Sequence, residues 1–382
     1  MKCVLHVGIH KTGSSAIQEA FDGYDDGMTR YADLGDCNHS IPLQIIFDRD
    51  LAADHQKRMG LSEAEMQAEA LRLVQRLDQA LEGDLQQLIL SGEEVSAFPE
   101  HSLAALREHL LRAADEINVL MFVREPLNWQ ASVYQEVLKY GETDPFHTGN
   151  RDIRGRYVRL ANVFGTDNVR VVKYEDKRQH GGDIISFFCD LIGVDRGQLC
   201  VDGTHVNKSL SEQATKILYR HNCLYPYRAG GGAVFQAHLN FFFHLSEIFD
   251  KDGKLDHAMF GVVVDKDDYI FLKDELGVNY DLSFPTDKDV VAYLDDIDPA
   301  AIAKIGSFLA SHGFDYDYAS DPDMAISTLF QFCAAQSFIE MGTVPNTKVD
   351  QLIAKRDQLE FERDHARRFP WKYLGQALGL KR

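Results

Sequence analysis

The chain has 382 residues, of which 45% are hydrophobic, and 40 Lys and Arg stand against 59 Asp and Glu, a net charge of −19. A chain of this length can bury a sizeable core and is long enough for one large or two ordinary domains. The negative charge opposes long-range attraction to nucleic acid, anionic lipid or a highly sulfated polymer, so nucleic acid is not an expected partner.

Cysteine usage and hydropathy indicate the compartment. The six cysteines form no C-x-x-C pair, which predicts neither a zinc site nor a disulfide framework. No apolar run approaches roughly 18 residues, and the chain enters a strand at once, so we expect neither a membrane span nor an uncleaved signal peptide. A reducing, cytoplasmic location is the resulting expectation.

The first 205 residues alternate strand and helix patterns. Apolar runs predict strands at 2–7, 85–90, 117–123 and 169–174, and helical spacing predicts helices at 14–21, 62–81, 100–116, 126–138, 156–164 and 183–192. Residues 22–60 read as an irregular, substrate-side excursion. This alternation predicts an α/β fold with a parallel sheet and helices on both faces.

Changes in the secondary-structure pattern and in charge along the chain predict three segments. Residues 1–205 form the predicted α/β core, and residues 206–345 form a mainly helical part that completes the core and the acceptor site, with a hinge at Gly230-Gly-Gly232. The tail 346–382 is basic and amphipathic, with nine Lys and Arg against five Asp and Glu. We expect it to dock on the body or pair with a second chain in a homodimer, in preference to weak attachment to a membrane surface.

The first loop has the form of an anion cradle. Gly8-Ile9-His10-Lys11-Thr12-Gly13-Ser14-Ser15 lies between a predicted strand and a predicted helix. Glycines let the backbone turn tightly with its N–H groups pointing inward, and the helix adds its partial positive end. A Walker loop would place lysine directly after Gly13, but two serines stand there and Lys11 lies inside the loop.

A second anion site is predicted at the end of the strand 117–123. Arg124 follows this strand directly, and Ser132 lies eight residues later, about two turns into the next helix. An arginine fork and a serine hydroxyl together can clamp a phosphate. Two anion sites at one sheet edge predict a ligand with phosphates at both ends of a nucleoside.

On these two motifs the chain resembles sulfotransferases that use 3′-phosphoadenosine 5′-phosphosulfate (PAPS). His10-Lys-Thr-Gly-Ser-Ser15 is similar to the family's 5′-phosphosulfate loop, and Arg124 with Ser132 matches its 3′-phosphate site. The resemblance covers about residues 1–215, with lesser similarities at Asn38-His39-Ser40, Ser91-Gly-Glu93, Lys173-Tyr-Glu-Asp176 and Asn207-Lys-Ser-Leu210. It implies a P-loop-like core that binds PAPS without a metal, with Asn38 and His39 toward the substrate.

The chemistry of sulfuryl transfer suggests a role for each group. Lys11 would stabilise the charge that develops on the departing phosphate oxygen, and the amides of Thr12 to Ser15 with the hydroxyls of Ser14 and Ser15 would hold the 5′-phosphate. Glu93, at a strand end, is the first candidate for the base that takes the proton of the acceptor hydroxyl. Glu94 and His39 are its rivals. A hydroxyl of a carbohydrate or glycolipid is the expected acceptor.

Other interpretations remain open at this point. Arg124 could form a structural salt bridge with Glu125 or Glu136, and Glu93 could merely begin a helix that favours negative charge. His6 is expected to be a core histidine, and Phe241-Phe-Phe243 to be core rather than a sugar platform. The whole chain could instead be a magnesium-dependent P-loop kinase, or a non-catalytic interaction protein that keeps the fold.

Overall fold

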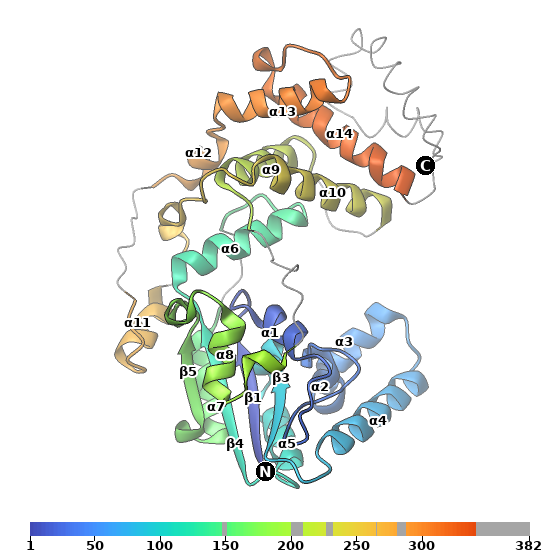
Figure 1. Ribbon diagram of the computed structural model, residues 1–382, viewed down its shortest axis with the longest axis vertical. Coiled ribbons are helices and arrows are strands. Elements are labelled where there is room, and N and C mark those ends of the chain that lie inside the picture. Colours follow the sequence, from blue (N-terminus) through green and yellow to red (C-terminus); the bar gives the residue numbers. More distant parts are fainter. Residues whose placement is uncertain (147–150, 200–208, 227–231, 265, 281–287, 341–382) are drawn as a thin grey trace. The chain divides into compact units, whose positions relative to one another are not determined.

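The computed structural model describes residues 1–146, 151–199, 209–226, 232–264, 266–280 and 288–340. Strands and helices alternate along its first half, and helices follow (Figure 1). In chain order the elements are β1 Lys2–Gly8, α1 Ser14–Phe21, β2 Thr29–Tyr31, α2 Ser40–Phe47, α3 Arg49–Met59, α4 Glu63–Ala80, β3 Gln87–Ser91, η1 Glu93–Ala97, α5 Glu100–Leu110, β4 Glu116–Val123, α6 Pro126–Lys139, α7 Ile153–Phe164, η2 Thr166–Asn168, β5 Val169–Lys173, η3 Tyr174–His180, α8 Ile184–Ile192, η4 Arg196–Gln198, α9 Glu212–Leu224, α10 Gly232–Ile248, η5 His257–Val262, α11 Lys266–Asp274, α12 Val290–Asp295, α13 Pro299–Ser311, η6 Tyr318–Ser320 and α14 Pro322–Glu340.

The five strands form one parallel sheet in the order β2-β3-β1-β4-β5. β1 lies at the centre, and its His6 stands opposite Ser91 of β3 on one side and Leu120 of β4 on the other. The connections from β1 lead first to one side of the sheet and then to the other. Ligands of such sheets bind at the carboxyl ends of the strands, where the direction of winding changes. The loops after β1, β3 and β4 all lie at this edge.

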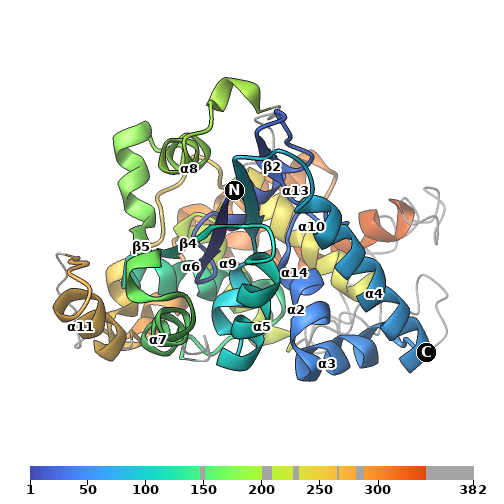
Figure 2. The ribbon, with the colours of Figure 1, turned by 90° about the horizontal axis from the view of Figure 1, so that it is seen from below.

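Helices cover both faces of the sheet. Figure 2 shows α8 on one side of the sheet and α5 and α7 on the other. On the α8 side, the Phe188 ring packs against Phe21 of α1 and Phe122 of β4, with centroids 5.4 and 6.2 Å apart. Burial of these large aromatic rings anchors both helices to the sheet. The predicted α/β class, with a parallel sheet between helices, is therefore confirmed.

The chain divides into two compact units that are discontinuous in sequence. Unit 1 comprises Met1–Trp129, Asn150–Val206 and Asp265–Leu282, and unit 2 comprises the remaining segments. One segment of unit 1 ends at Val206. Residues 130–149 and 265–282, however, belong to the opposite unit from the one in which a simple division at 205 puts them. The roles predicted for the three segments stay predictions.

Unit 2 is mainly helical, as the sequence indicates. Phe241 of α10 and Phe330 of α14 pack in its core with ring centroids 5.4 Å apart. Arg220 of α9 donates two hydrogen bonds of 2.9 Å to Asp323 of α14. Of the phenylalanine cluster predicted to be core, Phe241 and Phe242 are buried, but the Phe243 side chain is 54% exposed.

The segment between residues 22 and 60 differs from its prediction. It contains β2, α2 and α3 rather than an irregular excursion. β2 has three residues, too few to show a period, and α2 is so apolar around its circumference that it shows little amphipathic pattern. The next helix, by contrast, is confirmed, because Ser62 and Glu65 form the expected capping box at the start of α4.

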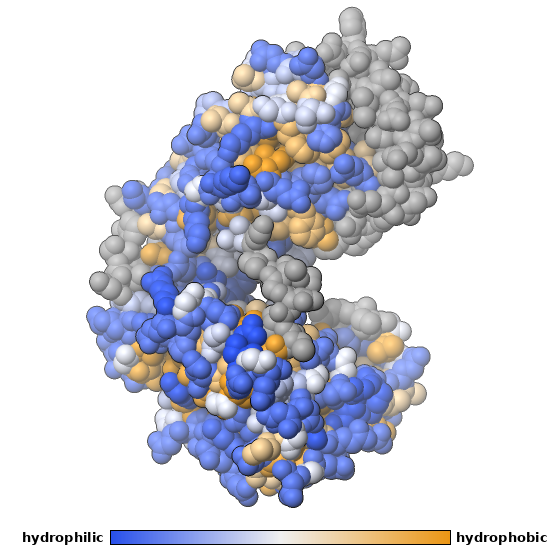
Figure 3. All heavy atoms as spheres, viewed as in Figure 1, coloured by the Kyte–Doolittle hydropathy of each residue, from blue (hydrophilic) through white to orange (hydrophobic). Residues whose placement is uncertain are grey.

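Some predicted features lie outside the described residues. These are most of the glycine hinge, Asn207 and Lys208, and the tail 346–382. In the described ranges, no helix is both long and apolar enough to cross a bilayer. The face drawn in Figure 3 is largely hydrophilic over α4, in keeping with the charged composition of that helix.

Four fully buried histidines predict that acid destabilises the fold. Burial lowers the pKa of His6, His39 and His238 to about 4 and lowers the pKa of His221 well below its usual value. These rings stay neutral in the folded protein, whereas the unfolded chain protonates them below about pH 6.5. The contribution of these four rings to the free energy of unfolding is therefore largest above that pH. Between pH 6 and 5 we expect urea denaturation to show a loss of about 1.4 kcal/mol per pH unit for each histidine.

Two matched substitutions compare how a buried and an exposed histidine contribute to the pH dependence of stability. His221→Phe should remove the contribution of one proton from the pH dependence, whereas His101→Gln, at an exposed position on α5, should leave it unchanged. Equal free energies of unfolding at pH 6 and pH 5 in the unsubstituted protein would contradict the prediction.

Candidate functional site

The loop after β1 has the backbone of an anion cradle. Lys11 and Gly13 both have left-handed φ angles, 67° and 83°. For lysine this is an uncommon conformation that neighbouring contacts must hold. The Thr12 side chain is fully buried, and its hydroxyl donates to the Ile9 carbonyl at 2.8 Å. Left-handed residues that alternate with other conformations, as Lys11 and Gly13 do on either side of Thr12, can turn backbone N–H groups toward a common centre, which suits an anion.

Glycine is required at position 13 for a second reason. A Cβ built there would lie 3.1 Å from Ile184 Cγ1 and 3.2 Å from Tyr174 Cε2. Gly13 is also the N-cap of α1, where no side chain occupies the first N–H groups and no acidic residue stands in the first turn. Ser14 is buried, with its hydroxyl 3.4 Å from that of Thr12, and Ser15 is exposed. The helix start can therefore receive a negative group.

Arg124 joins the two motifs that the sequence singled out. Its Nη1 donates to the Lys11 carbonyl at 2.8 Å, across 113 residues of sequence. Its Nε is buried without a hydrogen-bond partner in the described part of the chain, and burial lowers the pKa of the guanidinium. The sequence also allowed a structural salt bridge between Arg124 and Glu125. Instead, the Glu125 carboxylate accepts hydrogen bonds from the Leu127 and Asn128 amides at the start of α6.

Ser132 lies on α6, and the division between the two units falls at Trp129, between Arg124 and Ser132. Its joint action with Arg124 therefore stays a prediction.

Tyr174 was not predicted as a site residue. It follows β5 directly, and its ring has the Arg124 guanidinium carbon at 5.0 Å and the Lys177 Nζ at 4.0 Å from its centroid. The Lys177 ammonium also donates to the Tyr174 hydroxyl at 2.5 Å. Cations are attracted to an aromatic face, so the ring holds two positive charges beside Gly13. The sequence feature that could have indicated this residue is a tyrosine at the end of a predicted strand with a lysine three residues later.

His10 lies between the two candidate bases. Its Nε2 is 2.6 Å from Glu94 Oε1 and its Nδ1 is 3.2 Å from Glu93 Oε1. The hydrogen bonds to Glu93 and then to Glu94 raise the pKa of His10 to about 10. The same contact lowers the pKa of Glu94. At neutral pH His10 is therefore an imidazolium that lies between the two acidic side chains.

A series of contacts holds the His10 backbone in place. Trp129 Nε1 donates to the His10 carbonyl at 2.9 Å, and the Arg151 guanidinium lies over the Trp129 ring at 5.3 Å. Arg151 Nε is 3.6 Å from Asp268 of α11, and both side chains are almost fully buried. Asp268 of α11 thus supplies a counter-charge for Arg151, and both residues belong to unit 1.

Arg156 of α7 lies behind the acidic pair. Its Nη1 donates to the Ser96 hydroxyl at 2.7 Å, and the Ser96 hydroxyl is 2.8 Å from the Glu93 carbonyl. Burial lowers the pKa of Arg156, and the charge of Glu94 opposes this shift. The sequence offered no local signal for this arginine, because 60 residues separate it from Ser96.

Asn38 and His39, expected near the substrate, both have structural partners. The Asn38 side-chain oxygen accepts from the Ser40 amide at 3.0 Å at the start of α2. The His39 ring is fully buried, and its Nδ1 accepts from the Ser91 amide at 3.0 Å. His6, as expected, is a core histidine, with its Nδ1 2.8 Å from the Ser91 hydroxyl. His39 holds the end of β3, and we do not retain it as a base.

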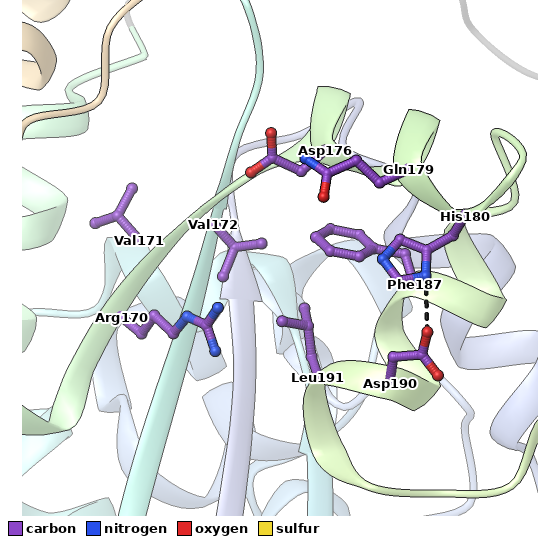
Figure 4. A pocket seen from close by; sticks show the side chains of 9 residues that line it. All are labelled: Arg170, Val171, Val172, Asp176, Gln179, His180, Phe187, Asp190 and Leu191. Atoms are coloured by element: carbon purple, nitrogen blue, oxygen red, sulfur yellow. Dashed lines mark ion pairs between the residues drawn. The ribbon is translucent and has the colours of Figure 1, made fainter.

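A separate pocket of about 380 Å³ lies at the edge strand β5. Figure 4 shows the side chains that line it, and His180 Nδ1 pairs there with Asp190 Oδ2 at 2.7 Å. Arg170 and Asp176 add one charge of each sign, and Val172, Phe187 and Leu191 supply the apolar surface. The pocket shares no residue with the loop, Arg124 or the acidic pair.

No family model and no curated protein matches the chain. Among solved structures, a sulfotransferase from Alicyclobacillus acidocaldarius aligns with 12% identity over 65% of this chain and 96% of its own, with a TM-score of 0.33. The sulfotransferase domain from the curacin biosynthetic pathway aligns with 11% identity over 76% and 95%, with a TM-score of 0.30. Likeness at this level does not establish a function.

The close contacts around Gly13 predict that a methyl group at this position lowers the free energy of unfolding. Gly13→Ala and Gly23→Ala both force alanine into a left-handed conformation, which costs about 1–2 kcal/mol. Gly23 has open space around its Cβ position, whereas Gly13 does not. We expect Gly13→Ala to lower the free energy of unfolding by about 1 kcal/mol more than Gly23→Ala, measured by urea denaturation. Equal losses in the two variants would contradict the tight packing at Gly13.

Proposed function

We propose that the protein is a sulfotransferase that moves the sulfuryl group of PAPS to a hydroxyl of a carbohydrate or glycolipid. The hydrogen bond from Arg124 to the Lys11 carbonyl carries this proposal. It brings Arg124, of the motif that resembles the family's 3′-phosphate site, beside the loop that resembles its 5′-phosphosulfate site. A nucleotide with anionic groups at both ends of its ribose would suit this arrangement.

The residues at the strand ends fit PAPS on two structural grounds. At the start of α1 no side chain caps the first backbone N–H groups and no acidic residue stands in the first turn, so an anionic ligand group can bind there. The buried Arg124 Nε has no partner in the described residues, so a donor is available for a phosphate oxygen. In the proposed complex, the loop from His10 to Ser15 holds the 5′-phosphate, and Arg124 with Ser132 holds the 3′-phosphate.

The mechanism needs a positive group where charge develops. PAPS, when bound, supplies an activated sulfuryl group on a phosphate leaving oxygen. Lys11 and the first amides of α1 stabilise the negative charge that grows on that oxygen, more in the transition state than in the ground state. Because lysine and arginine supply this charge, the proposal includes no metal. In the described residues, no three His, Cys, Asp or Glu side chains form a group that could hold a metal ion.

The base must lie on the acceptor side of the loop. Glu93 and Glu94 follow β3, the strand beside β1, and both lie within hydrogen-bonding distance of His10. The Glu93 side chain is 18% exposed and that of Glu94 is 36% exposed, so either can meet a hydroxyl group. A glutamate as the general base favours the proposal of a carbohydrate acceptor, because glycan-modifying members of the resembled family often use glutamate.

A magnesium-dependent kinase is the alternative from the same fold. It would need a lysine after Gly13 and a carboxylate at a strand end for the ion. Ser14 follows Gly13, and Glu125, after β4, caps α6 instead. Calorimetric titration with 3′,5′-bisphosphoadenosine and with ATP–Mg²⁺ separates the two. Binding of the bisphosphate and transfer of label from PAPS to a panel of glycans, lipids and phenols would support our proposal, and binding of ATP–Mg²⁺ alone would overturn it.

Loss of Lys11 and loss of Arg124 should have different kinetic effects. Lys11→Ala should lower kcat by about 10²–10³-fold with little change in donor affinity, because its charge acts in the transition state. Arg124→Ala should weaken bisphosphate binding by about 10–100-fold, because a charge-assisted hydrogen bond is lost. Lys273→Ala and Arg178→Ala, at exposed positions, are the matched controls. Normal turnover by a folded Lys11→Ala would remove its role, and a non-catalytic protein would leave the cellular phenotype of this variant unchanged.

The two acidic residues can be separated by isosteric substitution. We expect Glu93→Gln to lower kcat by about 10²-fold or more while bisphosphate affinity is retained, because a general base is lost. Glu94→Gln should have a smaller effect, since Glu94 forms the shorter contact with His10. Steady-state kinetics with the identified acceptor measure both values. A normal rate for Glu93→Gln together with a slow Glu94→Gln would move the base to Glu94.

Cytoplasmic location, homodimer formation and a role of the tail 346–382 remain part of the proposal. They rest on composition, since the tail lies outside the described residues. Comparison of the full chain with a chain ending at residue 345, by light scattering and by sedimentation with anionic vesicles, distinguishes a dimer from attachment to a membrane surface.

A further inference from the structure

The pocket beside β5 lies within unit 1 and has no part in the proposed reaction. Its volume of about 380 Å³ is within the range of about 300–1,000 Å³ that small-molecule sites occupy. Its walls come from three elements that follow one another along the chain, β5, η3 and α8. Among the described residues no strand pairs with the outer side of β5, so the pocket lies at the open edge of the sheet.

The centre of the pocket is apolar. Val172 of β5 and Phe187 of α8 are buried in one core cluster, and Leu191 packs against the same cluster. Arg170 lies two residues before Val172, so both side chains leave β5 on the same face of the sheet. In Figure 4 the polar side chains stand around these apolar ones. The pocket thus has an apolar floor that the core holds in place.

Five side chains with planar polar groups surround this floor. They are Arg170, Asp176, Gln179, His180 and Asp190. The pairing of His180 with Asp190 at 2.7 Å and the contact of its ring with Phe187, 5.0 Å between centroids, fix the imidazole. Arg170 and Gln179 form no hydrogen bond or ion pair with another described residue. The rim therefore offers donors and acceptors that the described part of the fold does not use.

The charges of the rim disfavour a simple ion as the ligand. Arg170 attracts an anion, whereas the carboxylates of Asp176 and Asp190 repel it, and a simple cation meets the reverse arrangement. A compact zwitterion such as an α-amino acid also fits poorly. Arg170 lies three residues before the end of β5, a rise of about 10 Å, and Asp176 lies beyond that end in η3. The opposite charges are thus set apart, whereas those of an amino acid share one carbon atom.

We propose that this pocket binds a saccharide. A pyranose ring carries hydroxyl groups around its rim and C–H groups on its faces, which matches a polar rim around an apolar floor. Each hydroxyl can donate and accept, so it can pair with the carboxylates, with the Arg170 guanidinium and with the Gln179 amide. The inference goes beyond the proposed function, because the pocket contains none of the residues assigned to PAPS. A free sugar, or a unit of a glycan acceptor remote from the reacting hydroxyl, supplies the same chemistry.

The first test measures binding without turnover. The full chain, labelled with ¹⁵N at histidine, is titrated with glucose, galactose, mannose and N-acetylglucosamine, and His180→Gln identifies the His180 ring signals. We expect at least one sugar to shift these signals with a dissociation constant of about 1 mM, as suits a small neutral ligand at an open site. Inorganic phosphate and free glycine are the anionic and zwitterionic probes. Shifts with phosphate or glycine alone, or no shift with any of the sugars, would overturn the inference.

Substitutions on the rim test whether the sugar binds in this pocket. Arg170→Met combined with Gln179→Leu removes polar groups at two exposed positions and leaves His180 as the reporter. Binding should weaken about tenfold or more, because each lost hydrogen bond costs about a factor of five. Arg178→Met, exposed on η3 but outside the pocket lining, should bind the sugar normally. Equal affinities of the double variant and the unsubstituted protein would place the sugar elsewhere and overturn the inference.

Steady-state kinetics separate the two sources of the saccharide. If a glycan acceptor supplies it, the double variant should raise KM for a long acceptor about tenfold, with kcat and the KM for a short acceptor unchanged. If a free sugar supplies it, neither KM changes. Both results agree with a saccharide in the pocket. Absence of transfer from PAPS would overturn the proposed function, but the binding tests would still decide this inference.

Discussion

The hydrogen bond from the Arg124 guanidinium to the Lys11 carbonyl is the contact on which the carboxyl edge of the sheet depends. It holds a lysine in a left-handed backbone conformation that isolated lysine disfavours. Trp129 holds the neighbouring His10 carbonyl in the same way. Both donors come from the segment that follows β4, so the parallel pairing of β1 with β4 determines the shape of the loop.

The charged side chains at this edge form two groups. Lys11, Arg124 and Lys177 surround the loop, while Glu93 and Glu94 are neutralised in part by His10 and Arg156. This local positive charge is compatible with a chain of net charge −19, because solvent screens exposed charges beyond about 8–10 Å. An anionic ligand therefore responds to the neighbouring cations rather than to the distant acidic surface.

Local patterns predicted much of the fold. The capping box at Ser62 and Glu65 and the apolar runs of β1 and β4 each involve residues close in sequence, and each was found close to its expected place. The three-residue strand β2 and the apolar helix α2 were missed, because neither is long or amphipathic enough to show a period. Their formation depends on the sheet and helices against which they pack.

The sequence by itself determined the α/β class and the glycine-bounded loop, and it singled out Arg124 as a candidate, because strand periodicity and turn conformation are encoded within a few residues. Only the tertiary structure decided that His39 is buried against Ser91, that the Tyr174 ring contacts two cations, and that His10 contacts both candidate bases. These contacts join residues 50 or more positions apart in most cases. They follow from the order of strands in the sheet, which periodicity along the chain does not specify.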